Sequence, residues 1–176
     1  MNLNLFRIVC AAACGVGLVL AQQVKQSPDV QPASVPDSKS SLIQPLSPEQ
    51  KVQFEAGKEL YAVICGACHQ PHGNGQEGLA PPLANSECAN GSDSRLIRIA
   101  LQGLRGPIKV SGKTFQLAMP AMAVLEDEQI AAVLTYIRRE WGNAAASVDS
   151  KTVARIRAET AKREEAWTEA ELLKIP

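Results

Sequence analysis

The sequence predicts an all-α fold, mainly because of how its apolar residues repeat. Three segments, starting near Ser47, Ser92 and Asp127, place apolar residues at intervals of three and four, the period of an amphipathic helix. Capping residues precede the first two segments, and glycine follows the second and third, as expected at helix ends. At 176 residues, the chain is long enough for one domain of ordinary size with extensions.

Residues 1–21 have the pattern of a secretory signal peptide. One cation, Arg7, precedes an apolar run from Ile8 to Ala21, and the small residue at its end predicts cleavage before Gln22. The run is short for a membrane span, but an uncleaved anchor is the alternative and would hold the protein at a membrane. We therefore predict a periplasmic or otherwise exported protein.

Residues 22–46 are rich in serine, proline and glutamine and show no apolar period. Such a segment cannot bury enough apolar surface to offset the entropy lost on ordering. It therefore predicts a disordered or extended linker.

The first helix is expected directly after this linker. Ser47 is a good N-cap, Pro48 suits the first helical position, and Gln50 completes a capping box. Gly57 lies in the middle of this helix, where glycine costs about 1 kcal/mol relative to alanine. Close approach by another helix would explain a glycine at this position.

The five residues Cys65-Gly66-Ala67-Cys68-His69 form the motif C-x-x-C-H, the attachment signature for c-type haem. A bare C-x-x-C can also be half of a zinc site, but no second cysteine pair follows at metal spacing. It can also be a thioredoxin-like redox pair, but that pair needs a preceding strand and a helix is expected here. A buried haem would also add apolar surface to a chain with seven aromatic residues.

Two more helices are expected downstream, with a loop or small hairpin between them. One ends at Gly103, and the other runs from Asp127 to Trp141. Between them, residues 106–115 have turn residues separating short apolar pieces, which predicts a loop or hairpin.

Gly57, Tyr61 and the C-x-x-C-H motif resemble the N-terminal helix of class I cytochromes c, and residues 127–138 resemble the last helix of bacterial monohaem cytochromes. This resemblance covers residues 47–142, which we predict to be a cytochrome c domain with its helices packed around one haem. One departure from the family is Glu126, which stands where serine or threonine usually caps the last helix. It predicts a loosely held first turn.

The resemblance also implies the residues that bind haem c and its iron. Cys65 and Cys68 would bond covalently to the porphyrin, and His69 would ligate the iron. A methionine on the opposite face is the usual second ligand in electron-transfer cytochromes c, and it raises the reduction potential. The Met-Pro pair of the family favours Met119; Met122 and a five-coordinate iron are the alternatives.

Two loop residues complete the site that the resemblance implies. The carbonyl of Pro81 would accept a hydrogen bond from the ligating imidazole, which fixes the ring and raises its donor strength. Leu83 would pack on the haem. His72 is too close to His69 in the chain to reach the opposite face, so we expect it on the surface.

Five cations occur between Asp93 and Glu126 with no acidic residue among them. A solvated face is the commoner outcome of such a pattern, and a docking patch for an acidic partner is the alternative. The cations are Arg95, Arg98, Arg105, Lys109 and Lys113.

Cys10 and Cys14 fall within the predicted signal peptide, so Cys88 alone remains after the motif cysteines are assigned. We expect it to be a small buried apolar residue, with a free thiol or an intermolecular bridge as the alternatives.

Residues 143–176 continue beyond the cytochrome pattern and predict a helical C-terminal extension. A helical stretch is expected over residues 151–163, and Thr168 and Glu171 form a capping box before a second short helix. Trp167 and nearby aliphatic residues predict that this arm packs back on the domain, with contact to another protein as the alternative.

These features predict one-electron transfer rather than enzyme activity. Such a protein would link a donor such as a periplasmic dehydrogenase to an oxidase or another cytochrome. A formal net charge of zero gives no bulk electrostatic reason to expect nucleic acid binding. The alternative is a haem enzyme or gas sensor, which needs an open or labile iron position.

Overall fold

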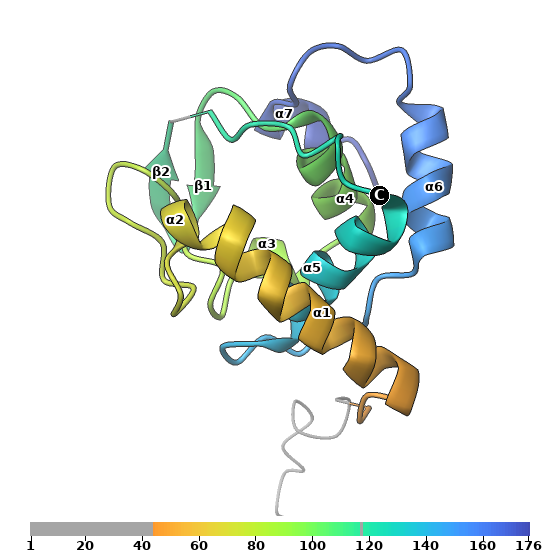
Figure 1. The fold of residues 1–176 in the computed structure, drawn as a ribbon. Coiled ribbons are helices and arrows are strands. Elements are labelled where there is room, and N and C mark those ends of the chain that lie inside the picture. Colours follow the sequence, from red (N-terminus) through yellow and green to blue (C-terminus); the bar gives the residue numbers. More distant parts are fainter. Residues whose placement is uncertain (1–43, 117) are drawn as a thin grey trace, which may run out of the picture. The chain divides into compact units, whose positions relative to one another are not determined.

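The computed structural model describes residues 44–116 and 118–176, and these residues are mostly helical, with one small hairpin (Figure 1). The elements are α1 (Pro48–Ile64), α2 (Gly66–His69), α3 (Glu87–Asn90), α4 (Asp93–Gln102), β1 (Ile108–Val110), β2 (Lys113–Phe115), α5 (Asp127–Arg139), α6 (Ser150–Glu159) and α7 (Glu169–Leu172). The predicted signal peptide and residues 22–43 of the predicted linker lie outside the described residues. Among the helices of the described ranges, none is both long and apolar enough to cross a membrane.

Helix α1 begins at the predicted capping box. The Ser47 hydroxyl accepts from the Gln50 N–H at 3.2 Å, and the Gln50 side chain accepts from the Ser47 N–H at 2.9 Å. Helix α5 crosses α1 at Gly57, where a Cβ atom would overlap the carbonyl oxygen of Ala132. The predicted close approach of two helices at Gly57 is therefore confirmed.

We expect Gly57→Ala to destabilise the protein, although alanine is the better helix former. Helix propensity alone would stabilise α1 by about 1 kcal/mol. The added methyl group must displace the backbone of α5, however, and overpacking of this kind costs about 1–3 kcal/mol or more. We expect a net loss of about 2 kcal/mol in the free energy of unfolding, measured by denaturant titration.

A matched control for this variant is Val52→Ala, on the exposed face of the same helix, where Val52 is 72% exposed. It should change stability by about 0.5 kcal/mol or less. A Gly57→Ala protein more stable than wild type would show that α5 does not need this close crossing.

Helix α4 ends at Gly103 as predicted, and residues 106–115 contain the β1–β2 hairpin, in which Ile108 pairs with Phe115. The short helix α3 was not predicted. It begins after Ser86, whose hydroxyl accepts from the N–H of Cys88 at 3.2 Å. These three elements provide one side of the cavity described below.

Helix α5 ends at Arg139, two residues before the predicted end at Trp141. Trp141 and Gly142 both have positive φ, 52° and 81°, so the backbone turns there. The Trp141 ring instead packs against Tyr61, with 4.9 Å between ring centroids, and covers Gly73. The aromatic residue therefore closes the loop after the cysteine motif rather than extending the helix.

The prediction of a loosely held first turn in α5 is wrong. The Gln129 side chain accepts a hydrogen bond from the Glu126 N–H at 2.9 Å. Arg157 of α6 donates to the Asp127 carboxylate at 2.7 Å. Contacts from within the turn and from a distant helix thus replace the missing serine or threonine cap.

Helices α6 and α7 pack back on the preceding elements, as the sequence predicted (Figure 1). Val153 and Ile156 of α6 are fully buried in the hydrophobic cluster that includes residues of α1, α4 and α5. Leu172 of α7 is buried in a second cluster with Leu104 and Ile108. The α6 helix ends at Glu159, before the end predicted for it. The extension is therefore part of the hydrophobic core.

Three of the five clustered cations bind this extension. Arg95 donates twice to the carbonyl of Ile175, at 2.9 and 2.6 Å. Arg98 pairs with Glu159 at 2.9 Å, and Arg105 donates to a backbone carbonyl of the extension at 3.2 Å. These three residues therefore bind the chain's own C-terminal segment, although the Arg105 side chain is still 53% exposed.

The capping box at the start of α7 predicts a dependence of stability on pH. Glu171 accepts from the Thr168 N–H, the Thr168 hydroxyl and Arg163, which lower its pKa from 4.5 to about 2, the backbone N–H having the largest effect. Because the pKa is lower in the folded state, this stabilisation is present above about pH 4.5 and is lost as the pH falls toward 2. The difference in Tm between wild type and Glu171→Gln should therefore shrink across that range. A constant difference would show that the charge of Glu171 does not stabilise α7.

Candidate functional site

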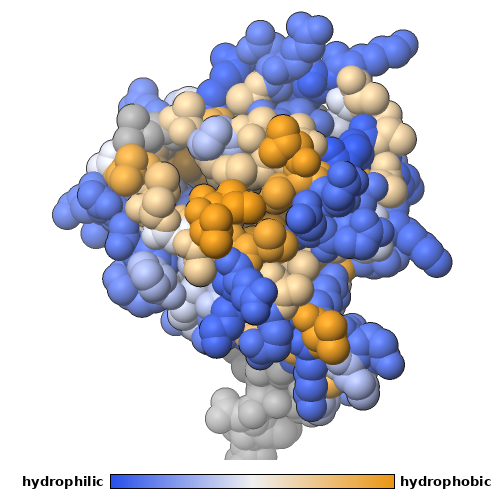
Figure 2. Space-filling model, viewed as in Figure 1, coloured by the Kyte–Doolittle hydropathy of each residue, from blue (hydrophilic) through white to orange (hydrophobic). Residues whose placement is uncertain are grey.

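Residues from α2, α3, α4, β1 and α5 line a cavity, and Figure 1 shows these elements arranged in a ring. Two adjoining hollows share His69, Pro81, Leu104, Ile108 and Met119, and together we call them the central cavity. The inner hollow is lined mostly by apolar side chains, as is typical of small-molecule and cofactor sites. Figure 2, which is viewed as in Figure 1, shows apolar side chains gathered at the centre of this face of the molecule. Within the described residues, no Asp, Glu, Lys or Arg lines this cavity.

The C-x-x-C-H motif forms the turn from α1 into α2. The N–H of Cys65 donates to Tyr61 and the N–H of His69 donates to Cys65, both at 2.9 Å. The Tyr61 hydroxyl also donates to the carbonyl of Gln70 at 2.7 Å, so a buried aromatic side chain holds the end of the motif. Cys65 and His69 line the inner hollow, and Cys68 lines the outer one. All three motif side chains therefore reach the same cavity.

The His69 ring is oriented by Pro81. Its Nδ1 lies 3.0 Å from the Pro81 carbonyl oxygen, which can only accept, so Nδ1 carries the proton and donates. Burial lowers the pKa of His69, an effect that this hydrogen bond partly opposes. A neutral ring protonated at Nδ1 leaves Nε2 with a free lone pair, which is the form that binds a metal.

The two alternative interpretations of the cysteine pair lose support. Helix α1, rather than a strand, precedes the motif. Burial raises the pKa of Cys65 to about 11, with a further contribution from Cys68, whereas redox-active pairs contain a thiol of low pKa. In the described ranges, no three His, Cys, Asp or Glu side chains are arranged to hold a metal ion such as zinc.

The two candidate methionines lie in different surroundings. Met119 lines both hollows of the central cavity. Met122 does not line the cavity; it packs against the main hydrophobic cluster, and its N–H donates to Ala100 at 2.8 Å. Leu83 lines the inner hollow, whereas His72 is exposed and accepts from the N–H of Asn74 at 3.3 Å. The geometry therefore groups Met119 and Leu83 with His69 and separates Met122 and His72 from them.

Asn143 supports the loop that carries Pro81 and Leu83, and sequence reasoning missed it. Its side chain is buried and donates to the carbonyls of Leu83 and Ile137, both at 2.7 Å. It joins the loop to the end of α5 and so fixes one wall of the cavity. An asparagine after Gly142 is an ordinary turn residue, and no signal in the sequence points to this contact.

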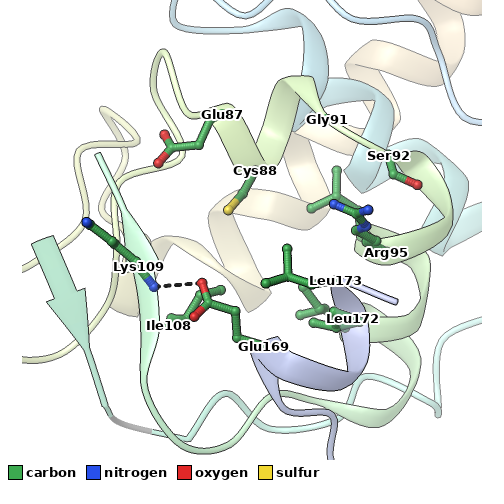
Figure 3. Close-up of a pocket in the computed structure, with 12 residues that line it drawn as sticks. Glu87, Cys88, Gly91, Ser92, Arg95, Ile108, Lys109, Glu169, Leu172 and Leu173 are labelled. Carbon is green, nitrogen blue, oxygen red and sulfur yellow. Dashed lines mark hydrogen bonds between the residues drawn. The ribbon is translucent and has the colours of Figure 1, made fainter. Parts of the chain in front are cut away.

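A further hollow shares Cys88, Leu96, Ile99 and Ile108 with the inner part of the central cavity (Figure 3). Its other side is formed by α7, where the Glu169 carboxylate accepts from the Lys109 N–H at 3.0 Å. Cys88 is partly buried, and burial raises the pKa of its thiol. Cys88 is thus only partly buried, rather than buried as predicted, and it packs against the second hydrophobic cluster. The extension covers this side of the cavity.

An apolar cavity with C-x-x-C-H on its wall and a histidine whose free ring nitrogen can bind metal defines a c-type haem protein. The sequence profile of the Cytochrome c family matches residues 54–141, half of the chain. The chain belongs to the cytochrome c family. It therefore binds haem c with its iron and acts as an electron carrier rather than an enzyme, as predicted.

Two kinds of curated relative resemble the chain. Cytochrome c-552 of Thermus thermophilus is 41% identical over 92 residues, covering 50% of this chain and 70% of the relative. The gluconate 2-dehydrogenase cytochrome c subunit of Pantoea cypripedii is 36% identical over 107 residues, covering 58% of this chain and 24% of that protein. The fructose dehydrogenase cytochrome subunit of Gluconobacter japonicus is 32% identical over 110 residues, covering 58% and 22%. This chain thus spans less than a quarter of the length of either dehydrogenase subunit.

Proposed function

We propose that this protein is an exported one-electron carrier in which Cys65 and Cys68 attach haem c, and His69 and Met119 ligate its iron. It would accept an electron from a periplasmic dehydrogenase and pass it to an oxidase or another cytochrome. The observation that carries the proposal is that His69 and Met119 line the same apolar cavity and come from separate segments of the chain.

The surroundings of His69 suit an iron ligand that stays in place. When bound, haem c supplies an iron centre that gains and loses a single electron. The Pro81 carbonyl holds the His69 ring in one orientation and one tautomer, and it raises the donor strength of the free nitrogen. A thioether from Met119 would favour the reduced state and raise the potential. Two fixed protein ligands leave no position for a substrate.

The walls of the cavity favour electron transfer over the enzyme and gas-sensor alternatives. Peroxide chemistry needs an acid, a base or an arginine close to the iron position. In the part of the chain that the structure describes, no Asp, Glu, Lys or Arg lines the cavity walls, and the one histidine there, His69, is the proposed ligand.

The outer lip of the cavity suits brief contact with redox partners. Cys68, Leu79, Ala118 and Pro120 line the outer hollow and are exposed, and none of them is an acidic or basic residue. Small uncharged side chains at this lip would let a partner approach the cavity closely. The names of the two dehydrogenase subunits support a dehydrogenase as the donor.

Export is consistent with the haem site. Covalent attachment of c-type haem takes place outside the cytoplasm, and the apolar run within residues 1–21 predicts a signal for export. The intact mass of the purified protein would test this part of the proposal, because cleavage before Gln22 and addition of haem each change the mass.

The test of the ligand set is the absorption spectrum of the full-length haem-bound protein, oxidised and reduced, with carbon monoxide added to the reduced form. We expect a low-spin spectrum, a weak methionine-to-iron charge-transfer band in the oxidised form, and no response to carbon monoxide. A high-spin spectrum, or prompt carbon monoxide binding, would mean an open or labile iron position and would overturn the proposal in favour of a ligand-binding haem protein.

A further inference from the structure

The segment between β2 and α5 carries both candidate methionines, and backbone hydrogen bonds attach it to the chain around Leu104. Leu104 and Met119 exchange two backbone bonds, at 3.0 and 2.9 Å. We call residues 118–126 the methionine segment. Because this segment has no regular structure of its own, the position of the Met119 side chain depends on what holds the backbone on either side of it.

Arg157 of α6 holds the far end of the methionine segment. Its guanidinium donates to the carbonyls of Ala123 and Leu125, at 2.8 and 2.6 Å, and to the Asp127 carboxylate at 2.7 Å. The planar fork of arginine can serve three acceptors in this way, which the single ammonium of lysine cannot reproduce. The Arg157 side chain is 32% exposed and that of Asp127 is 25% exposed, so water only partly screens the pair.

Trp167 holds the near end indirectly. Its backbone N–H donates to Gly103 and its carbonyl accepts from Arg105, at 3.0 and 2.8 Å. Residues 103–105 therefore lie between Trp167 on one edge and Met119 on the other. The Trp167 ring is fixed by Arg163, whose guanidinium carbon lies 3.6 Å from the ring centroid.

We infer that the C-terminal extension positions the sixth iron ligand, with Arg157 and Trp167 as positioning residues that hold Met119 in the central cavity. This inference rests on the proposed function, in which Met119 is that ligand. The extension attaches directly to the far end of the methionine segment through Arg157, and only indirectly to its near end, through residues 103–105. Among the hydrogen bonds of the described residues, Arg157 is the only donor to the carbonyls of Ala123 and Leu125. Losing them should let the segment move away from the iron without unfolding the helices.

Point variants test this better than truncation. Removal of the chain after Gly142 would take Val148, Val153 and Ile156 out of the main hydrophobic cluster, and the protein would lose stability for that reason alone. Arg157→Gln removes the contacts with the methionine segment and leaves the buried face of α6 intact. Arg155→Gln is the matched control, because Arg155 lies on the same helix and pairs with Glu159 instead.

The experiment compares the full-length haem-bound proteins at temperatures where far-ultraviolet circular dichroism shows each one to be folded. Losing hydrogen bonds from a charged donor should shift the local opening of the segment by roughly tenfold to a hundredfold. Arg157→Gln should therefore bind carbon monoxide roughly tenfold faster or more, weaken the methionine charge-transfer band and lower the potential. Arg155→Gln should match wild type in all three measurements.

The remaining outcomes separate the two proposals. If wild type itself lacks the band and binds carbon monoxide promptly, the proposed ligand set fails. If wild type behaves as a six-coordinate carrier and Arg157→Gln matches it while unfolding at lower temperature, Arg157 only stabilises the fold and the inference is overturned. Arg157→Lys keeps the charge beside Asp127 but not the fork; if it matches wild type in carbon monoxide binding, a role for the two carbonyl contacts is excluded.

Discussion

A chain in which serine replaces both Cys65 and Cys68 is expected to carry no covalently bound haem. Both residues line the central cavity, and only a thiol can form the thioether bonds that c-type attachment requires. Haem staining after denaturing electrophoresis should be absent, and the intact mass should correspond to the polypeptide alone. Because the cavity walls are largely apolar, the chain without haem should also unfold more readily than the haem-bound protein.

Cys88→Ala is the matched control for this experiment. Cys88 also lines the inner hollow but lies outside the C-x-x-C-H motif. This variant should keep covalent haem in full. Loss of haem from Cys88→Ala, or its retention in the double serine variant, would show that the C-x-x-C-H motif does not attach the haem.

The features that the sequence predicted correctly depend on short spacings within one segment. Three such features could be identified within a single stretch of the chain: the C-x-x-C-H motif, the capping box at Ser47 and the glycine at position 57. Gly57 even predicted a long-range contact, since a glycine inside a helix is costly unless something lies against it. The position of Pro81 beside His69 came from resemblance to the family, and the structure has the carbonyl within hydrogen-bonding distance.

The features that could not be predicted are contacts between polar side chains and distant backbone carbonyls. Arg138 is buried and donates to the carbonyls of Ala89 in α3 and of Gly91, which follows α3, yet in the sequence it is an ordinary cation in the last turn of a helix. Arg157 is likewise one of several cations on α6. The sequence does not show which backbone carbonyl will accept a hydrogen bond, because every residue has a carbonyl. Arg95 and Arg105, which donate to carbonyls of the extension, were for that reason assigned to a solvated face or an outside partner.

Met119→Leu is expected to open the sixth iron position, while Met122→Leu should leave it closed. Leucine nearly preserves the volume of methionine but has no sulfur to bind iron, so the cavity stays filled and the ligand is lost. The Met119 variant should lose the charge-transfer band, bind carbon monoxide when reduced, and show a potential lowered by roughly 0.1 V or more, within the ~0.8 V range that axial ligands span. Absorption spectroscopy and potentiometric titration would measure these changes.

Met122 makes the comparison decisive, because it lies three residues away in the same segment and packs in the hydrophobic cluster rather than at the cavity. Its replacement should change stability by less than about 1.5 kcal/mol and leave the spectrum unaltered. If Met122→Leu abolished the band and Met119→Leu did not, the ligand would be Met122. The backbone pairing of Met119 with Leu104 would then have no role in placing the iron ligand. If neither variant changed the spectrum, the iron would have no methionine ligand, and an iron position open to small molecules would be the better account of this cavity.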